Sequence, residues 1–247
     1  MGEATEELNI RDTAERWPVT SSSVLGHGSL VRLRRDMVRM PDGDVVGRDI
    51  LEHPGAVAVL ALDAAERVLM IRQYRHPVGR MLWEIPAGLR DVAGEPLHVT
   101  AQRELLEEAG YRAEQWQVLA DSFSSPGIST ERLRIFLARG LAEVPAAERS
   151  YVPEHEEAYL VQAWVPLDQA VARILAGDLH NAVTSLGIFS AYAAPQRSAE
   201  SASRSAGKPP SRAAYAAKIP TAVTPLWSSP ASTRRTASSS GSQASVR

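Results

Sequence analysis

The sequence predicts an α+β fold in which a mixed β-sheet is packed between helices. Two observations lead to this class. Short apolar or alternating segments recur along most of the chain, as strands do, whereas helical patterns are few and lie between or after them. The longest apolar segment, PGAVAVLALD at 54–63, is typical of a strand buried on both faces. Many strands with few helices favour helical layers on the outside of a mixed sheet.

The N-terminal part is expected to form an antiparallel β region. Residues 25–40 partly alternate apolar and charged side chains and lead into the turn signal Pro41-Asp42-Gly43. Residues 45–52 then return as the second strand of a hairpin. Further strands are expected at 68–74 and in MLWEIPAG at 81–88, where Pro86 ends the pairing.

One helix is expected to begin around Glu95 and Pro96, with an acidic first turn, and to end at Gly110. The other expected elements are strands at 116–123, 133–138 and in the apolar run 159–167, and helices at 168–176 and 180–194. The chain is thus expected to comprise an N-terminal β region, a core domain and a tail, at 1–53, 54–194 and 195–247.

Composition narrows the functional class. Hydrophobic residues make up 44% and charged residues 23%, as in soluble globular proteins. The longest uncharged apolar run, 55–62, is too short to cross a bilayer, so no membrane partner is expected. The N-terminus is acidic where a signal peptide is basic, and there are no cysteines, which excludes disulfides and thiolate chemistry. A cytoplasmic location is expected.

The tail at 195–247 differs from the rest of the chain. It holds eight Lys or Arg and one acidic residue, a net charge of about +7, whereas the whole chain has a net charge of −2. It is rich in Ser, Ala, Pro and Gly and shows no apolar period, so we expect it to be disordered. Its charges are spread out and have almost no interleaved aromatic residues, so a nucleic-acid partner is not expected.

The helix ended by Gly110 carries an acidic stripe. At 100° per residue, Glu104, Glu107 and Glu108 fall within about one quadrant of the helix. Like charges at this spacing oppose helix formation by roughly 0.2–0.5 kcal/mol per pair. Arg103 can pair with Glu107, but one guanidinium is not expected to serve all three carboxylates. A divalent cation that prefers oxygen ligands would serve them, and a solvated acidic face is the alternative.

The stretch GLRDVAGEPLHVTAQRELLEEAGY at 88–111 resembles the signature of Nudix hydrolases. One departure is that six residues rather than five separate Gly88 from Glu95, so the loop before the helix is one residue longer. From Glu95 onward the spacing is regular. The residues that carry the resemblance are Gly88, Glu95, Arg103, Glu104, Leu105, Glu107, Glu108, Gly110 and Tyr111.

Further segments are similar to the ADP-ribose pyrophosphatase branch of this family, in its mycobacterial type. Pro126 stands fifteen residues after Tyr111, as a proline does in that branch. The segments EHPGAVAVLAL, QYRHPVGR and WEIPAG are also similar. The resemblance covers about 21–194. It implies a Nudix-type α/β/α sandwich with a mixed β-sheet and an N-terminal antiparallel β-sheet region.

The resemblance also implies a reaction and a metal. The pyrophosphate of ADP-ribose would be hydrolysed to AMP and ribose 5-phosphate by attack of water at phosphorus. Mg²⁺ or Mn²⁺ would neutralise the diphosphate and activate the water. By resemblance, the metal ligands are Glu104, Glu107, Glu108 and the backbone carbonyl of Ala87.

The general base is expected, by resemblance, from the acidic loop at 151–158. Glu157 aligns best with the family position, and Glu156 and Glu154 are the alternatives. A merely solvated acidic loop is the other interpretation of this segment.

The resemblance assigns substrate contacts as well. Arg75 would face the phosphates, Glu84 would hold the terminal sugar or its neighbouring groups, and Arg48 would lie near the adenine, sometimes across a homodimer. Each could instead be an ordinary surface charge. The signature residues Gly88 and Arg103 are grouped with these contacts.

Two other functions stay open. The chain could hydrolyse another nucleoside diphosphate sugar or an oxidised nucleotide. It could also be a noncatalytic ADP-ribose sensor, but such sensors usually lose signature carboxylates and carry a helical DNA-binding domain. This chain keeps every signature glutamate, and its tail has no helix-turn-helix pattern.

Overall fold

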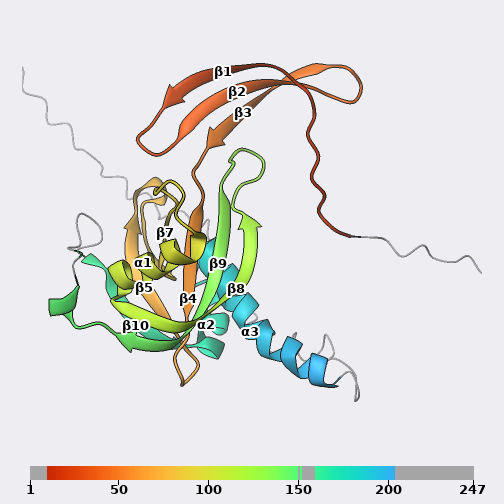
Figure 1. Ribbon diagram of the computed structural model, residues 1–247. Coiled ribbons are helices and arrows are strands. Elements are labelled where there is room, and N and C mark those ends of the chain that lie inside the picture. Colours follow the sequence, from red (N-terminus) through yellow and green to blue (C-terminus); the bar gives the residue numbers. More distant parts are fainter. Residues whose placement is uncertain (1–9, 150, 152–158, 204–247) are drawn as a thin grey trace, which may run out of the picture.

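The computed structural model describes residues 10–149, 151 and 159–203 (Figure 1). Its N-terminal sheet has the order β1-β2-β3 and is antiparallel throughout. The hairpin expected at Pro41-Asp42-Gly43 is confirmed, since it joins β2 and β3. The expected single strand at 25–40 is wrong, because a turn in which the Gly28 N–H donates to the Val31 carbonyl interrupts it (2.8 Å). The strands are β1 (Val19–His27), β2 (Arg32–Arg39) and β3 (Val45–Glu52).

Two further sheets form the body of the molecule. One has the order β7-β4-β9-β8, with β4 and β9 parallel and the other pairs antiparallel, so the expected mixed sheet is confirmed. The other has the antiparallel order β10-β5-β6. Their strands are β4 (Ala56–Ala61), β5 (Arg67–Arg75), β6 (Arg80–Glu84), β7 (Ala87–Leu89), β8 (Tyr111–Phe123), β9 (Arg132–Glu143) and β10 (Val161–Pro166), and short 3₁₀ turns lie at His76–Val78 and Ala146–Glu148.

Helices cover both faces of the central strand β4. Val57 and Val59 pack in the cluster that contains Leu105 of α1 (Leu97–Ala109). Ala58 and Leu60 point the other way and join the cluster that includes residues of α2 (Leu167–Leu175) and α3 (Ala182–Ser203). All four of these strand side chains are fully buried. Burying a Val or Leu side chain stabilises the fold by about 1.5–3 kcal/mol, so both layers contribute. The α/β/α sandwich is confirmed.

Helix α1 carries the acidic stripe, and its two ends are set by the residues that the sequence singles out. Pro96 stands at the N-cap, and its carbonyl accepts the N–H groups of Val99 and Thr100 at 2.8 and 3.2 Å. The expected acidic first turn is wrong, because Glu95 lies before the cap and the helix begins at Leu97. Gly110 ends the helix as expected, in the left-handed conformation with φ 73° that glycine adopts without a steric penalty.

Helix α3 begins after Asn181, whose side-chain oxygen accepts the N–H of Thr184 (2.9 Å) as an N-cap does. The helix continues to Ser203, beyond the expected end at Ala194. Residues 204–247, most of the expected tail, lie outside the described part. Among the described residues, no helix is both long and apolar enough to cross a membrane.

Candidate active site

The site is built where the backbone of β7 meets the acidic face of α1. A Cβ atom on Gly88 would fall only 2.0 Å from the carboxyl carbon of Glu104, so only glycine lets the strand lie against this side chain. One residue earlier, the Ala87 N–H donates to Glu108 Oε2 at 2.8 Å. The two carboxylates therefore face the strand that precedes the signature loop, and the backbone of that strand orients one of them directly.

Arg103 contacts four carboxylates of this region, including that of Glu104. Its Nη1 lies 2.8 Å from Glu104 Oε1 and 3.0 Å from Glu107 Oε2. Its Nη2 lies 3.3 Å from Asp91 Oδ1 and 3.6 Å from Glu95 Oε2. The expected pairing of Arg103 with Glu107 is confirmed, and the same guanidinium also contacts Glu104, Glu95 and Asp91.

The charge state of Arg103 follows from these contacts. Burial alone would lower its pKa, but the negative charges of Glu104, Glu107 and Glu95 and the hydrogen bond to Glu107 outweigh burial and raise the pKa above its ordinary value. The guanidinium stays protonated, so it offsets part of the repulsion among the glutamates of the helix.

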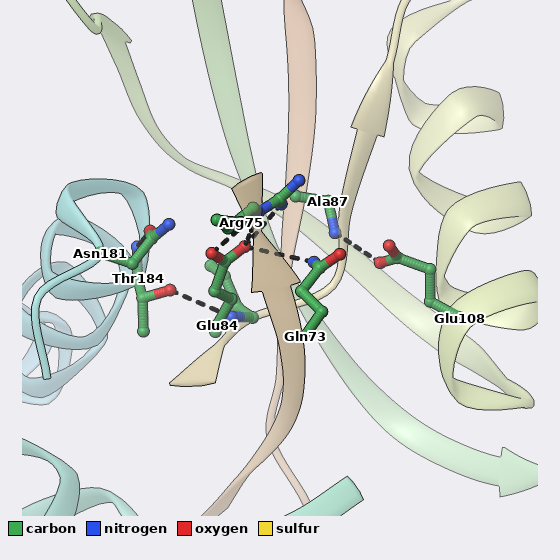
Figure 2. A network of polar contacts seen from close by, with 8 residues as sticks. Gln73, Arg75, Glu84, Ala87, Glu108, Asn181 and Thr184 are labelled. Atoms are coloured by element: carbon green, nitrogen blue, oxygen red, sulfur yellow. Dashed lines mark hydrogen bonds and ion pairs between the residues drawn. The ribbon is translucent and has the colours of Figure 1, made fainter. Parts of the chain in front are cut away.

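Another ion pair lies close to the contact between β7 and α1. It joins Arg75 of β5 to Glu84 of β6 (Figure 2). Arg75 Nε lies 3.0 Å from Glu84 Oε1, and Arg75 Nη2 lies 2.6 Å from Glu84 Oε2. Gln73 adds a third donor to the same carboxylate at 3.3 Å. The Glu84 side chain is only 3% exposed, whereas that of Arg75 is 42% exposed, so a buried carboxylate fixes an arginine side chain that is partly exposed.

Helix α3 supports this pair from the other side. The hydroxyl of Thr184, a fully buried residue, accepts the N–H of Ile85 at 3.1 Å and so fixes the backbone just after Glu84. Figure 2 places Thr184 and Asn181 on one side of the Arg75–Glu84 pair, and Ala87 and Glu108 on the other. The segment 84–88 is thus held by α3 at its start and by α1 at its end.

A cavity of about 490 Å³ opens over this segment. Four of the residues expected at the site, Arg75, Glu84, Ala87 and Gly88, line it together. The carboxylates of Glu104 and Glu108 adjoin it through their contacts with β7. A volume of this size is typical of small-molecule sites.

Sequence reasoning missed three polar residues that also line the cavity, namely His53, Glu131 and Asn181. Asn181 carries a local signal, since Asn before an apolar run is a common N-cap. His53 and Glu131 come together where the end of β3 pairs with the loop before β9, through hydrogen bonds such as that from the Leu51 N–H to the Ile128 carbonyl at 2.7 Å. No pattern in the sequence predicts this contact between the end of β3 and the loop before β9.

His53 contacts both Gly55 and Glu131 through one ring nitrogen. Its Nδ1 accepts the N–H of Gly55 at 3.0 Å and lies 3.7 Å from Glu131 Oε1. These contacts fix the ring at the edge of the cavity.

One expected position does not line this cavity, and another lies outside the described residues. Arg48 lies exposed on β3 in the N-terminal sheet, where its Nη1 donates to the Gly47 carbonyl at 3.2 Å, and it is not among the lining residues. Glu157, with its alternatives Glu154 and Glu156, lies outside the described residues.

The donor set suits a hard divalent cation in kind. Glu104 and Glu108 supply carboxylate oxygens beside the backbone of Ala87 and Gly88, and the Glu104 side chain fills the space that a Cβ at Gly88 would take. Within the described ranges, no three acidic, His or Cys side chains converge as a ready-made metal site. Glu107, like Glu104, contacts Arg103, but no contact of Glu107 with β7 accompanies it among the described residues. The residues therefore fit a cation held by two carboxylates and completed by other oxygens.

Residues 52–185 match the NUDIX domain. Over 173 residues the chain is 48% identical to an ADP-ribose pyrophosphatase of Mycobacterium tuberculosis, which covers 70% of this chain and 82% of that protein. It is 36% identical over 188 residues to a methanol dehydrogenase activator of Bacillus methanolicus, with 76% of this chain and 94% of that protein covered. The chain therefore belongs to the Nudix hydrolase family, whose members generally need divalent metal ions.

A solved structure of an ADP compounds hydrolase has the same fold. It superposes with a TM-score of 0.61 over 75% of this chain and 98% of that chain, at 19% sequence identity. This likeness supports the α+β Nudix architecture and is independent of the sequence match.

The contact between β7 and α1 predicts the effect of Gly88→Ala. The added Cβ must displace the Glu104 carboxylate, and a misplacement of about 1 Å in such a site costs on the order of 100-fold in rate. We expect a loss of pyrophosphate hydrolysis of that order and weaker Mn²⁺ binding, measured by calorimetry.

Gly127→Ala is the matched control, because a Cβ at Gly127 meets no atom within 4 Å. It should leave both properties unchanged. Unaltered Mn²⁺ affinity in a folded Gly88→Ala protein would show that this contact does not organise the metal site.

Proposed function

We propose that the chain is a divalent-metal-dependent ADP-ribose pyrophosphatase, which releases AMP and ribose 5-phosphate. The observation that carries this proposal is that Arg75, Glu84, Ala87 and Gly88 line one cavity beside the carboxylates of α1. The likeness to the mycobacterial enzyme, at 48% identity over most of its length, supports the choice of substrate.

Glu104 and Glu108 would hold the metal together with the carbonyl of Ala87, and Glu107 would help with a further ion. Mg²⁺ or Mn²⁺, when bound there, supplies positive charge for the diphosphate and lowers the pKa of a coordinated water. Arg103 reduces the electrostatic repulsion among the carboxylates, because it contacts Glu104 and Glu107 at once. In this role Arg103 offsets the negative charge of the glutamates. A direct contact between Arg103 and the substrate is a separate part of the proposal.

Arg75 would bind the diphosphate. Its guanidinium is partly exposed in the cavity while Glu84 fixes its direction from behind. A fixed guanidinium matches phosphate oxygens without first losing side-chain freedom. Glu84 has its carboxylate engaged by Arg75 and Gln73, so its contact with the sugar groups would come through lone pairs that these donors leave.

Two parts of the proposal concern the assembly. Arg48 would reach the adenine from the N-terminal sheet, in keeping with a homodimer in which that sheet lies near a second copy. The sheet exposes apolar side chains that a dimer could cover, with Val19 at 51%, Val24 at 50% and Val45 at 41% exposure. A cytoplasmic location also belongs to the proposal and is supported by the absence of cysteines.

A substrate panel tests the proposed function. ADP-ribose, an ADP-hexose, GDP-mannose and a dinucleoside polyphosphate are incubated with the protein and Mg²⁺ or Mn²⁺, and the products are identified by chromatography. We expect kcat/KM for ADP-ribose to exceed that for GDP-mannose by at least tenfold, a difference of about 1.4 kcal/mol in transition-state binding. Equal rates on all four compounds would contradict the ADP-ribose assignment.

The base assignment predicts that Glu157→Gln lowers kcat by about 10²–10⁴-fold, the range for loss of a general base. Mn²⁺ affinity should stay within a factor of two, because Glu157 is not proposed as a metal ligand. Glu154→Gln and Glu156→Gln serve as matched controls. If either control lost the activity instead, the base would be that residue.

A further inference from the structure

A second and larger cavity adjoins the cavity of the candidate active site. Its volume is about 770 Å³, and three arginines line it, namely Arg90, Arg132 and Arg134. It shares Ala56 and Leu133 with the first cavity, so the two adjoin at the ends of β4 and β9.

The two cavities open on different faces of the sheet. Arg132 and Arg134 alternate with Leu133 along β9 and lie on the same face as Phe136, which packs in the α1 cluster. The first cavity is lined instead by Asn181 and Val183 at the start of α3, on the opposite face. A ligand in the larger cavity would therefore lie across the sheet edge from the Arg75–Glu84 pair.

The arginines of the larger cavity differ in their partners. Arg134 forms a two-point ion pair with Asp121, with both N–O distances at 2.7 Å, and this hydrogen bonding lowers the pKa of Asp121, so that pair is internally neutralised. In the described part of the chain, no side-chain hydrogen bond or ion pair engages Arg90 or Arg132. The one other acidic lining residue is Asp12. The lining thus keeps a surplus of positive charge.

Apolar groups surround these charges. Phe123 is paired with Arg132 across the β8–β9 ladder, and 58% of its surface is exposed. Leu97, Pro126, Ala56 and Leu133 also line the cavity. An exposed ring beside an arginine provides a face on which a nucleobase can stack, while guanidinium groups suit a phosphate.

We propose that this cavity, formed by Arg90, Arg132 and Phe123, is a second binding site, for a nucleoside monophosphate. The phosphate pairs with Arg90 and Arg132, and the base stacks on Phe123. A volume of about 770 Å³ falls in the range of small-molecule sites and is large enough for a mononucleotide. AMP is the natural probe, and its binding can be measured without turnover, so the test does not depend on the proposed reaction.

The test is a calorimetric titration of the full chain with AMP, in the absence of divalent metal. Arg132→Gln and Phe123→Ala should each weaken AMP binding by about tenfold, the effect of losing one charge-assisted hydrogen bond or one stacking contact. Adenosine and inorganic phosphate should each bind more weakly than AMP, since each engages only half of the site. Arg112→Gln, an exposed arginine at the far end of β8, is the matched control and should change nothing.

Three results would overturn the proposal. AMP binding that survives both cavity variants but is lost in Arg75→Ala would place the nucleotide in the candidate active site alone. Phosphate that binds as tightly as AMP would leave no role for Phe123. An absence of AMP binding, with a change of oligomeric state in Phe123→Ala on sedimentation, would show that the exposed ring belongs to a subunit interface.

Discussion

The close approach of β7 to helix α1 is the constraint on which the site depends. Gly88 lets the strand lie directly against the Glu104 carboxylate, and the backbone N–H of Ala87 takes hold of Glu108 one turn later on the helix. Both contacts need the strand and the helix at a fixed separation. That separation is set by the buried cluster under α1, where Leu105 and Ala101 pack on Val57 and Val59. The position of the proposed metal ligands is therefore set by the packing of the core.

Arginines balance the charges that this arrangement gathers. Arg103 contacts four carboxylates around the signature loop and the start of α1, which would otherwise repel one another. Arg75 has the opposite task, because Glu84 and Gln73 fix it in place while much of its side chain stays open to the cavity. One arginine offsets the negative charge of the glutamates, and the other would present positive charge to an anionic ligand under the proposed function. An arginine suits both tasks because its planar guanidinium donates in several directions at once.

Sequence reasoning succeeds where structure is local. The buried strand β4, the helix stop at Gly110 and the acidic stripe all follow from patterns within a few turns of chain, and the family resemblance is carried by the same short stretch. Sequence reasoning fails where contacts depend on strand register or on the path of a loop. Arg75 meets Glu84 only because β5 and β6 pair with Ile71 opposite Glu84, which places Arg75 four residues further along the same face. Two of the four partners of Arg103, namely Asp91 and Glu95, likewise depend on how the loop before α1 folds back.

The three cavity residues that sequence reasoning missed share one property. His53, Glu131 and Asn181 reach the cavity from three elements that are distant in sequence, and they meet through contacts such as that of Leu51 with the loop before β9. Arg48 is the opposite case. The resemblance places it near the adenine, but in the structure it does not line the cavity. Chain topology thus decides these cases.

The central claim is that α1 and β7 together form the metal platform beside Arg75. A crystal structure of the protein with Mn²⁺ and a non-hydrolysable ADP-ribose analogue tests it most directly, with the anomalous signal of manganese locating the ion. The account predicts manganese bound by Glu104 and Glu108 next to the Ala87 carbonyl, with the diphosphate within hydrogen-bonding distance of Arg75. Manganese bound elsewhere, or a diphosphate that does not reach Arg75, would contradict it.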